Sequence, residues 1–372
     1  MRRRGMLVVM AGATAAAACS LVFPFDGYGP GSPLADAGSA DVVAVDAADV
    51  FVPGCPLAHA PPPPAADDPG GADTDITLAL GTLVLGLGTA TTPGLDLDGL
   101  CSCPDVTPCE GPQRVCDREG GVDNSFDDLL AKFGAFGAPI SQDKIQAALD
   151  NGATTVLMVV HRYNGTPNDT SVELGIMASL GTTPDGTGTP VPPRRDGTDE
   201  WTIDPDSVAN NTPPFVPKSI ATAAYVTGGV LVARGAFTIS LGSGTALTIT
   251  LDEGFFVGRL SHDGTIWRVA EGRIGGRWPT SKMLTSFSVL QDPVDKTAFL
   301  CGDSGAYQAY KPQLCAAADI MTTAGNDLSD KKCDAVSIGM GFDAAEAKLG
   351  ALAPPRVLPA GCGADWRDEC AR

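Results

Sequence analysis

Cysteine content constrains this chain of 372 residues more than any other feature, because 11 cysteines follow or flank what looks like an export signal. The signal has arginines at 2–4, an apolar stretch from Met6 and small residues at 16–18, and it is too short to span a bilayer. Exported proteins fold where cysteines pair, so an odd number leaves one cysteine to be explained. If Cys19, directly after the signal, does not form a disulfide, ten cysteines remain that can pair. These ten are Cys55, Cys101, Cys103, Cys109, Cys116, Cys301, Cys315, Cys333, Cys362 and Cys370.

Residues 16–19, Ala-Ala-Ala-Cys, resemble the lipobox of bacterial lipoprotein signals. This resemblance implies cleavage before Cys19 and attachment of lipid to that residue. Ser20 in the next position favours the outer membrane or the cell surface of a bacterium. Since no other long apolar run is present in the sequence, the lipid is the expected membrane contact. Cleavage at the same bond without lipidation is the alternative.

Composition divides the chain after the signal peptide (1–18) into three parts. Residues 19–74 are acidic and rich in proline and glycine, which predicts a flexible tether. A β body with inserted helices and a cysteine-rich loop is expected over 75–300. A helical segment, stapled by disulfides and packed on the body, is expected over 301–372. With 44 acidic and 25 basic residues the formal net charge is −19, which argues against a nucleic-acid partner and favours cation binding.

Apolar patterning predicts a mainly β fold with helical additions. A continuous apolar run at 155–160 indicates a buried strand, and alternation at 171–178 indicates a half-exposed strand. Asp263-Gly264 is typical of a hairpin turn. Successive strands with short connections favour antiparallel neighbours, so we expect a disulfide-stabilised, antiparallel β-sandwich of the jelly-roll type. The predicted helices cover residues 125–136, 141–151, 280–290, 306–321 and 343–349.

An acidic loop is the strongest candidate site. Between Gly94 and Gly99, Asp96 and Asp98 lie two residues apart, so an extended backbone places both carboxylates on the same side. Calcium takes roughly six to eight oxygen ligands, and nearby disulfides would hold such a loop rigid. The spacing is not that of an EF-hand, and the alternative is a set of solvated turn residues before a helix. The predicted calcium ligands are Asp96, Asp98, Asp117, Asp123, Asn124 and Asp127.

Two short motifs resemble enzyme nucleophile segments. The residues from Cys301 to Gly305 resemble the nucleophile segment of trypsin-like proteases, but His161 lacks the setting that this family requires. Ser141-Gln-Asp-Lys matches the Ser-x-x-Lys motif of penicillin-binding proteins without its companion motifs. In both segments a serine that caps a helix is the simpler explanation, so we expect Ser304 and Ser141 to be caps.

The chain as a whole resembles the Ala-, Asp- and Gly-rich surface lipoproteins of myxobacteria, a group that implies no particular activity. The resemblance rests on residues 18–22 (Ala-Cys-Ser-Leu-Val), the acidic tether and the disulfide-bearing β body. We expect a non-enzymatic binding or structural role at the outer membrane, stabilised by calcium, with no catalytic residue assigned. Two other classes stay open. One is a secreted hydrolase of polysaccharide or peptide that uses paired acids or Ser304. The other is a glycan-binding module that uses Trp201, Trp267 and Trp278.

Overall fold

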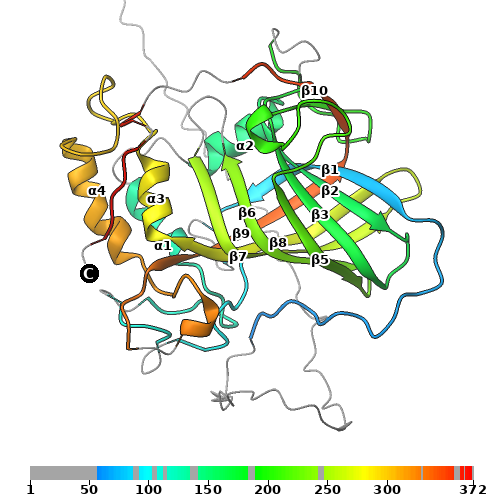
Figure 1. Ribbon diagram of the computed structural model, residues 1–372, viewed down its shortest axis with the longest axis horizontal. Helices are drawn as coiled ribbons and strands as arrows, with labels where there is room; N and C mark the ends of the chain where they lie inside the picture. The colour runs from blue at the N-terminus through cyan, green and yellow to red at the C-terminus, as the bar shows by residue number, and fades with distance from the viewer. Residues whose placement is uncertain are drawn as a thin grey trace, which may run out of the picture. The chain divides into compact units, whose positions relative to one another are not determined.

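A computed structural model gives the arrangement of the folded part of the chain. It describes residues 57–86, 92–102, 107–111, 115–134, 141–182, 189–241, 247–327, 330–355, 361–363 and 365–370. Within these residues, ten strands form one curved sheet and four α-helices accompany it (Figure 1). The predicted mainly β class with helical additions is confirmed.

The strands are β1 (Thr74–Val84), β2 (Thr155–Tyr163), β3 (Asp169–Ser179), β4 (Glu200–Ile203), β5 (Ser219–Thr227), β6 (Val230–Leu241), β7 (Leu247–His262), β8 (Trp267–Pro279), β9 (Ala335–Glu346) and β10 (Lys348–Leu352). The helices are α1 (Ser125–Gly134), α2 (Gln142–Asp150), α3 (Thr280–Phe287) and α4 (Gly305–Ala316), with short 3₁₀ helices η1 (Pro205–Ser207) and η2 (Ala324–Asn326).

The sheet closes into an eight-stranded barrel, where the sequence predicts a sandwich. Its hydrogen-bonded order is β10-β4-β3-β2-β1-β9-β8-β7-β6-β5, and β5 also pairs with β3. The closing pairs run antiparallel from Asp169↔Val226 to Ile176↔Ser219. β4 and β10 pair with each other in parallel and lie outside this closed ring. The fold therefore differs from the predicted sandwich because β3 pairs past β4 with β5, which leaves no free edge in the ring.

Apolar side chains fill the inside of the barrel. Leu78 of β1, Leu174 of β3, Phe256 of β7 and Met340 of β9 are fully buried in the largest apolar cluster. Phe256 stacks edge to face on Phe237 of β6, with ring centroids 4.8 Å apart. Burial of this many large side chains supplies most of the driving force for folding. The interior is consequently a packed core, and candidate sites must be sought on the outer wall.

β2 is buried on both faces, which explains its continuous apolar run. Met158 points into the main core, whereas Leu157 and Val159 belong to a second cluster on the outer side of the sheet. Trp201 and Ile203 of β4 pack in that second cluster. A strand that is covered on both sides needs no polar alternation. The predicted buried strand at 155–160 is confirmed.

Helices α1, α3 and α4 gather at one end of the barrel (Figure 1). Ser141 caps α2 by accepting from the backbone N–H of Lys144, and Ser304 caps α4 by accepting from that of Tyr307. Both serines therefore have the capping role that the sequence predicts.

The prediction of a helix at residues 343–349 is wrong. These residues end β9 and begin β10, and Ala344 and Ala345 pair with Val269 and Arg268 of β8. Ala344 is also packed into the main core. Pairing with β8 and burial in the barrel outweigh the modest helix propensity of an alanine-rich segment.

Three disulfides connect distant parts of the chain. Cys109 is bonded to Cys333, Cys301 to Cys362, and Cys315 to Cys370. Cys362 and Cys370, although near each other in sequence, are therefore not bonded to each other, and both connect the C-terminal segment to the α4 region. Trp366 stacks on Tyr307 of α4 with centroids 5.5 Å apart, and Asp368 pairs with Lys311 at 2.6 Å. Cys101 and Cys116 are also disulfide-bonded, whereas Cys19, Cys55 and Cys103 lie outside the described residues.

The last part of the predicted tether follows the surface of the body. The backbone N–H of Asp68 donates to the Asn168 carbonyl at 3.0 Å, and the carboxylate of Asp67 accepts from the Thr170 N–H at 2.6 Å. These bonds fix residues just before β1 to the turn between β2 and β3. Residues 19–56 of the tether lie outside the described residues.

Candidate metal centre

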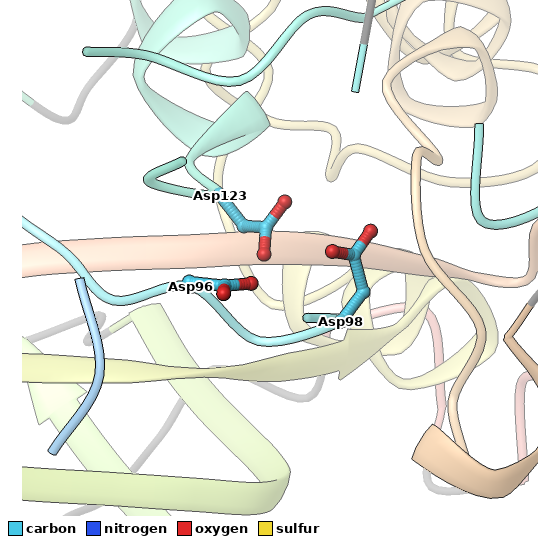
Figure 2. Close-up of side chains that lie close together, drawn as sticks. All are labelled: Asp96, Asp98 and Asp123. Carbon is cyan, nitrogen blue, oxygen red and sulfur yellow. The ribbon is translucent and has the colours of Figure 1, made fainter. Parts of the chain in front are cut away.

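The acidic loop crosses the outer wall of the barrel as a short extended segment. Leu95 packs against Val230, Val232 and Val257 of β6 and β7, and its side chain is buried. Figure 2 shows the carboxylates of Asp96 and Asp98 close to that of Asp123. The predicted alternation of apolar and acidic side chains is therefore confirmed.

Glycines in β8 and β9 allow the loop to lie directly on the wall. Gly275 and Gly339 pair with each other in neighbouring strands. A Cβ atom on Gly275 would come within 3.3 Å of Leu95 and Leu97, and one on Gly339 would come within 2.2 Å of the Pro93 carbonyl oxygen. Larger residues at either position would push the loop away from the sheet.

Asp96, Asp98 and Asp123 each offer a carboxylate oxygen to one point. These three oxygens lie within 4.8 Å of one another. Asp96 and Asp123 are buried, and Asp98 is half-buried. Asp123 comes from the segment just before α1, and it reaches the loop because its backbone N–H donates to the Leu95 carbonyl at 3.0 Å. The structure thus brings together three of the six predicted ligands from two separate segments.

Backbone N–H groups hold each of the three carboxylates in place. Gly99 N–H donates to Asp96 Oδ1 at 2.8 Å, and Leu100 N–H donates to Asp98 Oδ1 at 2.8 Å. Leu97 N–H donates to Asp123 Oδ2 at 2.6 Å. These bonds fix the carboxylates and occupy one oxygen of each.

The second oxygens of Asp96 and Asp98 are buried without a hydrogen-bond donor. Asp96 Oδ2 and Asp98 Oδ2 have no hydrogen-bond partner, although the His59 Nε2 atom lies 3.5 Å from Asp96 Oδ2. Buried carboxylate oxygens normally have a partner, and an orphaned one calls for an explanation such as a bound ion. Both orphaned oxygens belong to the cluster of three.

Burial raises the pKa of every carboxyl group in the cluster. The pKa of Asp98 rises to about 8 through burial and through repulsion by Asp117, Asp96 and Asp327. Burial and repulsion by Asp98 and Asp117 place the pKa of Asp123 well above its ordinary value. Burial also raises the pKa of Asp96. Three ionised groups at this spacing repel one another, so the cluster must take up protons or a cation.

The three other predicted ligands have different surroundings. Asp117 lies beside the cluster, where its Oδ2 accepts from Ser102 N–H at 2.6 Å, and burial raises its pKa to about 6. Asn124 instead links α1 to β9, because its side chain exchanges two hydrogen bonds with the backbone of Gly339. Asp127 lies in α1, 3.6 Å from Arg118. Asp117 lies beside the cluster without belonging to the group of three converging carboxylates, whereas Asn124 and Asp127 are engaged elsewhere.

Arg277 of β8 ties the acidic loop to the barrel, and sequence patterning did not single it out. Its guanidinium is 1% exposed, donates to the Leu97 carbonyl between the two aspartates and pairs with Asp327 at 2.6 Å. A buried arginine needs a paired acid and carbonyl acceptors. Because β8 also contains Arg268, Glu271 and Arg273, no signal in the sequence distinguishes Arg277 from the other charged residues of the strand.

Ser304 and His161, the residues considered for a protease-like site, make contacts that support the fold. Ser304 Oγ donates to Asp292 at 2.6 Å while capping α4, and His161 Nδ1 lies 3.1 Å from Asp75. Trp201 and Trp278 are buried in the core and offer no platform for a sugar. Among the described residues, the acidic cluster is the only group of three metal-ligating side chains.

None of the helices within the described residues combines the length and the apolar composition needed to cross a lipid bilayer. Comparison with models of protein families, with curated proteins and with solved structures found no match for this chain.

Proposed function

We propose that this chain is a non-enzymatic, calcium-stabilised surface lipoprotein whose acidic loop binds one Ca²⁺ ion. The observation that carries the proposal is the pair of buried, donor-free oxygens on Asp96 and Asp98, which face a third carboxylate on Asp123. A divalent cation at this point would neutralise the mutual repulsion and provide both oxygens with a partner.

The chemistry of the donors favours calcium. All three ligating groups are carboxylates, which are hard oxygen donors, and the cluster contains no sulfur. Water or backbone carbonyls would complete the roughly six to eight oxygens that calcium prefers. Mg²⁺ demands a smaller, near-octahedral site and gives up its water reluctantly, so it should bind more weakly.

The proposed role of the ion is structural. It would join the acidic loop on the barrel wall to the segment that carries Asp123 and leads into α1. The bond from the Asp123 N–H to the Leu95 carbonyl already connects these two segments. A protein exposed outside the cell meets enough calcium to keep even a weak site filled, which suits an extracellular module.

Calorimetry on metal-free protein tests this proposal. We expect Ca²⁺ to bind with 1:1 stoichiometry and to raise the melting temperature of protein that was first treated with EDTA, because a ligand of the native state stabilises it. Mg²⁺ at the same concentration should give a smaller rise. Absence of Ca²⁺ binding at millimolar concentrations, with identical melting in EDTA and Ca²⁺, would refute the proposal.

Attachment to the outer membrane through Cys19 is the second part of the proposal. It is supported by the lipobox-like residues 16–19 and by the even number of cysteines that remain. In a bacterial host, Cys19→Ala should move the protein from the membrane fraction to the soluble fraction. Unchanged membrane partition of that variant would contradict lipidation.

A further inference from the structure

We propose that occupancy of the cation site controls whether residues 57–61 are docked on the barrel, and hence how much chain separates the body from residue 19. This inference rests on the proposed function. Asp96 is only 8% exposed and its Oδ2 has no hydrogen-bond partner, with His59 Nε2 of residues 57–61 at 3.5 Å, and this is the second observation that marks the cluster as a ligand site. The element that the site would control is the segment of residues 57–61.

The acidic loop lies between the N-terminal segment and the segment before α1. On one side the Asp96 N–H donates to the Ala58 carbonyl at 3.1 Å. On the other side the Leu95 carbonyl accepts from the Asp123 N–H at 3.0 Å. The loop therefore lies between the two segments, with one backbone hydrogen bond to each, and its order determines whether either bond can form.

Residues 57–61 also touch the barrel beyond the loop. Ala60 packs on the outer apolar cluster that contains Leu95 and Val257. The Tyr225 hydroxyl of β5 donates to the Pro61 carbonyl at 2.5 Å. The segment thus spans from the acidic loop to β5, and Tyr225 provides a contact that lies outside the cation site.

The charges of the cluster link these contacts to the ion. Without a cation, Asp96, Asp98 and Asp123 repel one another within 4.8 Å whenever they ionise, and this repulsion weakens the hold of the wall on the loop that carries two of them. If the loop moves, the Asp96 N–H no longer donates to the Ala58 carbonyl, and the Leu95 side chain no longer lies against Ala60. A bound cation opposes this movement, so it holds the docking surface for residues 57–61 in place.

Binding equilibria of this kind are reciprocal. If the ion favours docking, then loss of a docking contact must weaken binding of the ion by the same factor. Tyr225→Phe removes the bond to Pro61 and leaves the ring and the acidic cluster unchanged. Tyr163→Phe is a matched control, because the Tyr163 hydroxyl likewise donates to a loop carbonyl, that of Thr166 at 2.7 Å, far along the chain from the acidic loop.

Two measurements on the full mature protein test the inference. The first is the rate of proteinase K cleavage within residues 57–61, followed by mass spectrometry in Ca²⁺ and in EDTA. The second is the Kd for Ca²⁺ of the wild type and of both tyrosine variants. We expect Ca²⁺ to slow cleavage about tenfold or more, Tyr225→Phe to raise the Kd about threefold to tenfold, and Tyr163→Phe to leave it within about twofold.

The possible outcomes separate the two proposals. Equal cleavage in Ca²⁺ and EDTA, together with wild-type affinity in Tyr225→Phe, would overturn the docking inference while calcium binding stood. Equal weakening by both tyrosine variants would also overturn it, because the effect would not be specific to the docked segment. Failure of the wild type to bind Ca²⁺ would overturn both.

Discussion

Asp98→Asn should stabilise the metal-free protein and weaken calcium binding, two effects of opposite sign from one substitution. The asparagine oxygen can keep the bond from the Leu100 N–H, now made to Asp98 Oδ1 at 2.8 Å. Its amide would stand where the donor-free Oδ2 lies and could donate to Asp96 or Asp123. The change therefore removes a charge and supplies a missing donor without altering the shape of the side chain.

The magnitude follows from the spacing of the charges. Two unit charges 4.8 Å apart repel by about 3.5 kcal/mol at an effective dielectric constant of about 20. Proton uptake relieves part of this at pH 8, because the pKa of Asp98 is about 8. We expect the free energy of unfolding in EDTA to rise by about 1–3 kcal/mol, which corresponds to roughly 2–6 °C in Tm for a chain of this size.

Loss of a carboxylate ligand should raise the Kd for Ca²⁺ by about 10- to 100-fold. Thermal unfolding at pH 8 in EDTA gives the first effect and calorimetric titration the second. Asp169→Asn is the control: Asp169 is buried, more fully than Asp98, and accepts two backbone bonds, from Asn164 at 2.7 Å and Ser171 at 3.0 Å. That control should lose stability and bind Ca²⁺ normally. Destabilisation of the metal-free protein by Asp98→Asn, or an unchanged Kd, would refute the reasoning.

Two further predictions concern pH and the disulfides. The pKa of Asp98 is raised from 3.8 to about 8 in the folded state, so its stabilising contribution is complete below about pH 4 and is lost as the pH rises through 8. In EDTA the Tm should therefore fall between pH 5 and 8, and saturating Ca²⁺ should reduce that fall; a flat profile in EDTA would contradict the raised pKa. Replacing both Cys315 and Cys370 by serine opens a loop with a sequence separation of 55 and should lower the free energy of unfolding in urea by roughly 4 kcal/mol. A loss below about 1 kcal/mol would show that packing of Trp366 on Tyr307 holds the C-terminal segment without the bond.

Features that depend on neighbouring residues were predictable from the sequence. The alternation around Asp96 and Asp98 fixes which side chains share a face, because an extended backbone has a period of two. Ser141 and Ser304 were predictable as helix caps, since an N-terminal serine satisfies free backbone N–H groups. The apolar run of β2 identified a buried strand without any knowledge of what covers it.

Features that depend on long-range pairing were not predictable from the sequence. Nothing near β3 indicates that it pairs with β5 rather than only with β4, and this one choice turns a sandwich into a barrel. The same limit applies to the site: Asp123 meets Asp96 only through the bridge to Leu95, while its neighbour Asn124 turns to β9. Gly275 and Gly339, which pair across β8 and β9, allow the loop to lie on the sheet. Their role can be recognised only once β8 and β9 are known to be adjacent.

The position of the site outside the barrel explains how the fold brings like charges together. The interior of the barrel is filled with apolar side chains, so its wall is a firm support on which Leu95 is buried. Arg277 fastens the Leu97 carbonyl to β8, and backbone N–H groups orient each carboxylate. Packing on the wall therefore opposes the repulsion, and a bound cation would add to this hold by neutralising the carboxylates. The barrel wall thus holds three mutually repelling carboxylates close together, and a bound cation would neutralise their repulsion.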